Sequence, residues 1–134
     1  MHSQMVASDQ QTNIVAYSRG DACFRAGRFR EAISFFREAL DADPQDSECL
    51  FALGNCYSSL RKHKRAEASF RQALTLAPSE RHPALLFNLA NALFDQNCYA
   101  EAIAIYMQVP HGSSVWPACH RNIELAQLQL GSVT

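Results

Sequence analysis

The hydrophobic and polar residues of this chain recur at the spacing of amphipathic α-helices. In "EAISFFREAL", residues 31–40, Ala32, Phe35, Phe36 and Ala39 fall on one side of a helix, and charged residues occupy the other side. Prolines separate the helical stretches, because proline disrupts a helix interior but is tolerated in a first turn. Two prolines follow expected helix ends and two suit the first turn of the next helix: Pro44 and Pro78, then Pro83 and Pro117. The pattern predicts an all-α chain.

The helical pattern repeats at an interval of 34 residues. When "GRFREAISFFREALDADP" (27–44) is placed above "RKHKRAEASFRQALTLAP" (61–78), Ala32 falls on Ala66, Phe36 on Phe70 and Pro44 on Pro78. A third copy contains "YAEAIAIYMQVP" and is displaced by two extra residues, placed most simply within 79–82. Small residues recur where paired helices would touch, and large rings recur in the second helices: Gly20, Gly54 and Ala90, then Phe36, Phe70 and Tyr106. Such a period is typical of stacked helical hairpins.

The stretch "LGNCYSSLRKHKRAEASFRQALTLAP" (53–78) resembles a tetratricopeptide repeat, and the resemblance covers roughly residues 13–130. It implies a right-handed α-solenoid of antiparallel helix pairs with a concave face. We expect a flexible leader (1–12), three repeats (13–46, 47–82 with the linker insertion, and 83–116) and a last helical segment (117–134). That segment is either a capping helix or the first helix of an incomplete fourth repeat, and the chain could also be a fragment of a longer solenoid. Val109 and Pro110 depart from the pattern and must end the third repeat's second helix early.

Composition excludes several classes of protein. The 134 residues are 48 % apolar with a net charge of -1, which predicts an ordered domain without a general attraction for polyanions. No apolar run approaches a membrane span, and residues 1–13 lack the features of a signal peptide. Five scattered cysteines argue against a secreted disulfide framework and favour a reducing, cytoplasmic location.

The basic run at residues 61–65 aligns with the turn of the first repeat. Charge is expected in a solvated turn, and short basic runs are weak signals, so we expect no nucleic-acid binding. The run is retained as a possible secondary contact for a partner: Arg61, Lys62, Lys64 and Arg65. Cys119 and His120 could be imagined as a nucleophile and its base, but sequence neighbours on a helix do not face each other. We therefore expect no enzyme, no cofactor and no metal site.

By the resemblance, the first helix of each pair lines the concave groove at the second, fifth, ninth and twelfth positions of the repeat. Aromatic rings there would receive apolar anchors of a partner, while amides and carboxylates would hydrogen-bond its backbone. The alternative is that some of these rings pack on each other. The candidate groove residues are Tyr17, Asp21, Phe24, Phe51, Asn55, Phe87, Asn91 and Phe94.

The resemblance also narrows the partner. Tetratricopeptide domains that hold the C-terminal carboxylate of heat-shock chaperones use lysine, asparagine and arginine at set positions. The matching positions here are Tyr17, Asp21, Ala52, Ala84 and Asn88, so no cation remains and chaperone-tail binding is disfavoured.

Two functions fit these observations. The first is a scaffold or adaptor within a larger complex, binding a peptide or helix of a protein partner. The alternative is a small dedicated chaperone, because the repeat number, the extra helix and "LFALGNC" are similar to type III secretion translocator chaperones. Self-association through the last helix is a further hypothesis.

Overall fold

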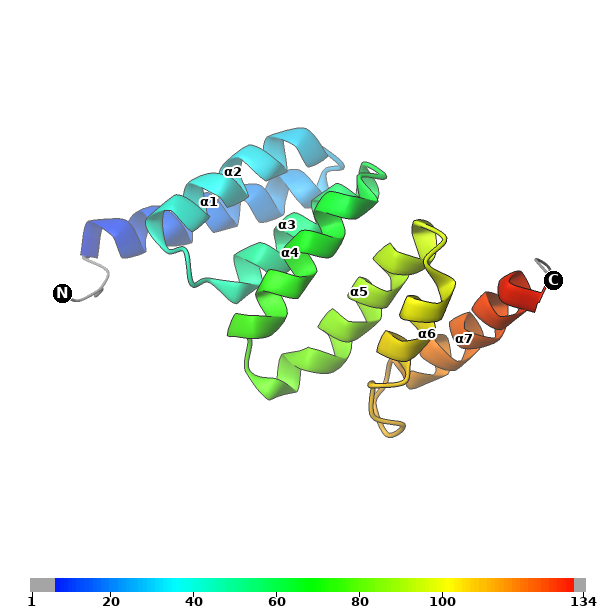
Figure 1. Ribbon diagram of the computed structural model, residues 1–134. Coiled ribbons are helices and arrows are strands. Elements are labelled where there is room, and N and C mark those ends of the chain that lie inside the picture. The colour runs from blue at the N-terminus through cyan, green and yellow to red at the C-terminus, as the bar shows by residue number, and fades with distance from the viewer. Residues whose placement is uncertain (1–6, 132–134) are drawn as a thin grey trace.

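The computed structural model describes residues 7–131, and these residues form helices and turns without a strand. Each helix packs against the next one along the chain, so that the helices form a stack with α1 and α7 at its opposite ends (Figure 1). The expected all-α solenoid of helix pairs is confirmed. In chain order the elements are α1 (Ala7–Arg25), α2 (Phe29–Ala42), α3 (Ser47–Ser59), α4 (His63–Leu76), the 3-10 turn η1 (Ser79–Arg81), α5 (His82–Asp95), α6 (Tyr99–Tyr106) and α7 (Trp116–Gly131).

The closest approach within each pair places a small residue beneath an aromatic ring. A β-carbon added at Gly54 would lie 2.4 Å from Cε1 of Phe70, and one added at Gly20 would lie 2.7 Å from Cε1 of Phe36. Both rings are fully buried, so neither has solvent into which it could move. The helices of a pair can therefore approach this closely only because the facing position lacks a side chain.

Each turn between paired helices uses one residue in the left-handed backbone region. The three residues occupy equivalent positions, with φ of 78° at Gly27, 61° at Arg61 and 65° at Asn97. In the second repeat the turn closes through the Lys62 backbone N–H, which donates to the Tyr57 carbonyl at 2.8 Å. Glycine and asparagine tolerate this conformation, whereas arginine is strained in it.

Two sequence-based expectations near the ends of elements need correction. Residues 7–12 are the first turns of α1, not a flexible leader, and residues 1–6 lie outside the described part of the chain. The α1 helix is fixed by Asn13, whose amide donates to the Ala39 carbonyl at 3.0 Å and to Asp46 at 3.1 Å.

The basic run is not wholly a turn. Helix α4 begins at His63, so Lys64 and Arg65 belong to its first turn and only Arg61 and Lys62 lie in the connection. The sequence-based expectation was wrong because Arg61, in the left-handed conformation, lets the turn close within three residues, whereas the basic run contains five.

The third repeat ends as Val109 and Pro110 predicted. Helix α6 stops at Tyr106, and Val109 is buried in the main hydrophobic core. Helix α7 then packs on α6, with Cys119, Ile123 and Ala126 buried. The opposite side of α7 stays open, with Leu125 51 % and Leu128 68 % exposed.

We predict that Gly54→Ala destabilises the protein although alanine is the better helix former. Helix propensity favours alanine by about 1 kcal/mol, but overpacking against Phe70 costs about 1–3 kcal/mol. The free energy of unfolding in urea should fall. Gly112→Ala is the control, because nothing lies within 4 Å of its added β-carbon. A stabilised Gly54→Ala protein would show that the ring yields.

We predict that Arg61→Gly stabilises the protein by about 0.5–1 kcal/mol. Relief of the left-handed strain gains about 1–2 kcal/mol, and glycine's greater freedom in the unfolded chain offsets part of it. Thermal and urea unfolding measure the change. Arg61→Ala removes the charge but keeps the strain, so it should give no comparable gain. Equal gains from both variants would instead attribute the effect to charge repulsion in the basic run.

Candidate functional site

A pocket of about 170 Å³ lies on the surface formed by α1 and α3 and is bordered by η1. It gathers five of the eight groove residues expected from the sequence: Tyr17, Asp21, Phe24, Phe51 and Asn55. The remaining three expected residues, Phe87, Asn91 and Phe94, lie on α5 and do not line this pocket. The rest of its lining is Phe36, Glu48, Ala52 and Arg81.

The aromatic row is anchored within the repeats. In each repeat the ring on the first helix packs against the ring on the second helix, and two further ring pairs flank the turns. Phe51 is consequently 9 % exposed, and the other rings of the row are half-buried. Tyr17, Phe24 and Phe51 are therefore partly covered walls of the pocket rather than freely exposed rings. The centroid distances are 5.5 Å for Tyr17–Phe36, 6.0 Å for Phe51–Phe70 and 6.3 Å for Phe87–Tyr106.

The polar row is partly used to join neighbouring repeats. The Asn88 amide donates to the Asn55 side-chain oxygen at 3.1 Å. In the same way the Asn122 amide donates to Asn91 at 3.1 Å, and the buried Tyr106 hydroxyl donates to the same oxygen. These contacts occupy the side-chain oxygens of two of the three polar groove residues.

Asp21 has no such partner, because the position equivalent to Asn88 is held by Ala52. Its carboxylate pairs with Arg25 at 3.0 Å, one turn further along α1. The Arg25 side chain is 78 % exposed, so this pair adds little to stability and separates easily. The carboxylate of Asp21 is thus the polar groove group most open to a ligand.

The linker insertion brings a cation to the pocket that sequence reasoning missed. The Arg81 guanidinium donates to both carboxylate oxygens of Glu48, at 2.8 Å and 3.1 Å, and lies 5.1 Å from the centre of the Phe51 ring. The five positions that match the carboxylate-binding residues of the family carry no cation, but the pocket does contain one. Arg81 was missed because it lies in the linker insertion, outside the positions that repeat. The extra residues within 79–82 were the available signal.

Two carboxylates of the pocket, Glu48 and Asp21, act on the ionisation of Tyr17. Burial raises the pKa of Tyr17, and the nearby carboxylates of Glu48 and Asp21 raise that pKa further. Tyr17 therefore stays a neutral phenol that presents a ring face and a hydroxyl.

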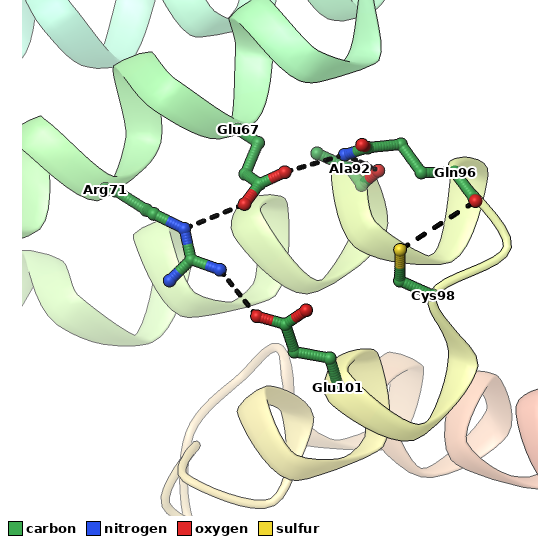
Figure 2. Close-up of polar contacts among 6 residues, drawn as sticks. All are labelled: Glu67, Arg71, Ala92, Gln96, Cys98 and Glu101. Carbon is green, nitrogen blue, oxygen red and sulfur yellow. Dashed lines mark hydrogen bonds and ion pairs between the residues drawn. The ribbon is translucent and has the colours of Figure 1, made fainter.

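The basic run lies elsewhere, beside an open groove of about 890 Å³ that also contains Glu67, Asp95 and Glu101. Figure 2 shows the polar network that crosses from α4 to the third repeat, in which Arg71 donates to Glu67 and to Glu101. Burial pushes the pKa of Glu67 upward, but hydrogen bonds from Gln96 and Arg71 outweigh it and leave that pKa lowered. Acidic and basic groups are therefore mixed on this surface, and its role as a secondary contact stays a prediction.

Cys119 is not an accessible nucleophile beside His120. Cys119 is fully buried, and burial raises the pKa of its thiol, so the pairing with His120 does not form a reactive site. Burial likewise raises the pKa of Cys56 to about 11. Within residues 7–131 no three histidine, cysteine or acidic side chains gather at metal-binding distance, and none of the described helices could cross a membrane.

The pocket thus lies on the open side of stacked helical hairpins, which is the arrangement of a helical-repeat interaction scaffold. Models of the tetratricopeptide repeat match residues 11–79 and residues 50–110. The chain belongs to the tetratricopeptide repeat family.

Curated relatives match a small part of their own length. Superkiller complex protein 3 of Mus musculus is 30 % identical over 115 residues, which are 86 % of this chain and 7 % of the relative. Superkiller complex protein 3 of Homo sapiens is 32 % identical over 91 residues, which are 68 % of this chain and 6 % of the relative. The chain therefore spans less than a tenth of the length of these relatives.

Solved structures with the same fold include peptide complexes. The first tetratricopeptide domain of Spaghetti (RPAP3), bound to an HSP90 peptide, has a TM-score of 0.76 and 20 % identity, covering 90 % of this chain and 97 % of that chain. The TPR2B domain of yeast Sti1, in a pHsp70 complex, has a TM-score of 0.81 and 16 % identity, covering 89 % of this chain and 98 % of that chain. MamA has a TM-score of 0.83 and 16 % identity, covering 92 % and 71 %. At these identities the likeness shows the fold alone.

We predict that Asn91→Ala lowers the free energy of unfolding by about 2 kcal/mol, because it leaves the buried Tyr106 hydroxyl without its acceptor. Asn55→Ala breaks a single amide pair and should cost less, about 1 kcal/mol. Urea unfolding with both variants measures the difference. Equal losses in the free energy of unfolding would contradict the prediction, because the hydrogen bonds of Asn91 to Tyr106 and Asn122 would then stabilise the protein no more than the Asn55 pair does.

Proposed function

We propose that the chain is an adaptor that binds a segment of a partner protein along the open surface of α1, α3, α5 and α7. The observation that carries this proposal is the pocket between α1 and α3, where the Asp21 carboxylate and aromatic ring walls meet. Concave surfaces of solenoids bind extended partners in this way.

A second open region extends the same surface toward the last helix. Arg121, Leu125 and Leu128 occupy the groove positions of α7 and lie along an open hollow on that helix. Exposed leucines next to a charged residue are typical of interaction surfaces. The two regions together suit a partner segment that contacts the stack at more than one point.

The relatives support a place in a larger assembly. The mouse and human relatives are both named superkiller complex protein 3, which places them in a complex by name. This chain resembles a short stretch of each. The peptide complexes of similar fold support binding of a partner segment. We propose that the chain works as a non-enzymatic binding module in a reducing, cytoplasmic compartment, where its free thiols are stable.

We expect groove substitutions to release the partner without unfolding the scaffold. The test compares affinity capture from source-cell extract by the wild-type chain and by Asp21→Lys/Leu128→Ser. Both positions are at least partly exposed, unlike Phe51, so the variant should stay helical by circular dichroism. Bound proteins are quantified by mass spectrometry.

The matched control is Asp41→Lys/Met107→Ser, which makes the same chemical changes away from the groove, with Met107 64 % exposed. Partners kept by the wild type and the control but lost by the groove variant support the proposal. Loss from neither variant would exclude the groove as the binding surface. A single retained client would favour the dedicated-chaperone alternative, and several subunits of one complex would favour the adaptor.

A further inference from the structure

A cation of the chain itself lines one side of the pocket between α1 and α3, which we call the filled half. Arg81 reaches it from η1, pairs with both oxygens of Glu48 and lies over the Phe51 ring at 5.1 Å. A guanidinium attracted by a carboxylate and by the face of an aromatic ring is a favourable arrangement. The structure thereby shows which chemistry one half of this pocket accommodates.

The other half offers the same two kinds of group, and the cation paired with its carboxylate is the exposed Arg25, which does not line the pocket. Tyr17, Asp21 and Phe24 lie at i, i+4 and i+7 on α1 and so share one face of that helix. Two rings therefore accompany one carboxylate here, as a ring accompanies Glu48 in the filled half. The ion pair of Asp21 with the exposed Arg25 lies at the helix surface and is easily exchanged for a better-placed cation.

We propose that the open half of this pocket binds a lysine or arginine side chain of the partner segment, with its charged group at Asp21 and its methylenes against the rings of Tyr17 and Phe24. This inference rests on the proposed function and specifies the chemistry of its partner. It makes the pocket a site for a basic side chain rather than for an acidic chain end.

The size of the pocket agrees with a single side chain. Its volume is about 170 Å³, whereas sites for drug-sized ligands occupy about 300–1,000 Å³. A cavity of about 150 Å³ holds a benzene-sized molecule, which is comparable with a guanidinium and its adjoining methylenes. A whole helix or a bulky ligand does not fit.

Arg81 also limits how tightly the pocket can bind a basic side chain of a partner. Because it neutralises Glu48 and covers Phe51, it keeps one carboxylate and one ring face from an incoming cation. Replacement by glutamine frees both groups. Arg81→Gln should therefore bind a basic side chain more tightly than the wild type does, whereas a site for acidic groups would be weakened by the same change.

The test is a ¹H–¹⁵N correlation NMR titration of the full chain at low salt. The probe is Nα-acetylarginine amide, and the comparison probes are the amides of acetylnorleucine and acetylglutamate. We expect saturable shifts at the backbone amides of Asp21, Phe24 and Asn55 with the arginine probe. Asp21→Asn should weaken binding about fivefold, as expected for one partly exposed charge pair, and Arg81→Gln should strengthen it about fivefold.

Asp41→Asn serves as the matched control, because it removes an exposed carboxylate outside the pocket and should leave binding unchanged. Equal shifts from the norleucine probe would overturn the proposal, because the pocket would then bind apolar chains only. Stronger binding of the glutamate probe, weakened by Arg81→Gln, would assign the opposite polarity. No shift from the arginine probe, with groove-dependent capture of a partner intact, would reject this inference while leaving the proposed function standing.

Discussion

Contact between one aromatic ring and one small residue in each pair determines how the whole stack is spaced. Phe36 and Phe70 are fully buried against Gly20 and Gly54, where even a β-carbon would overlap the ring. In the third pair the equivalent positions are held by Ala90 and Tyr106, and both are fully buried. Since interiors are close-packed, this contact fixes how near the paired helices lie to each other.

The same rings decide which groove side chains are available to a partner. Rings of the second helices support the rings of the groove from behind, so the aromatic row is held in place and only partly exposed. Asparagines occupy the polar row of the later repeats, because Asn88 and Asn122 donate to the side-chain oxygens of Asn55 and Asn91. The first repeat lacks such a donor, and the open carboxylate of Asp21 is the consequence. Binding chemistry is thus concentrated where the regular pattern of the stack is broken.

Two departures from the repeat pattern distinguish this chain from a regular stack of identical repeats. The extra residues of the linker form η1 and deliver Arg81 to the pocket. Arg61 occupies a left-handed position that glycine and asparagine hold in the other repeats. The first departure changes the charge of the groove, and the second retains a basic side chain at a cost in backbone strain. Both lie in connections, where a solenoid accepts change without disturbing its packing.

The sequence by itself determined the solenoid, because the period of 34 residues and the recurring small and aromatic positions describe one hairpin that can bury its surface only by stacking. Five of the eight groove residues expected from the sequence line one pocket, and their role in binding a partner stays a prediction. Only the tertiary structure decided that Asn91 joins Tyr106 and Asn122, because those contacts unite residues from three helices. It likewise decided that Arg81 enters the pocket, since a repeat pattern cannot position a residue inserted between repeats. Periodicity specifies the packing shared by all repeats, whereas the contacts of irregular segments depend on where the packed helices place them.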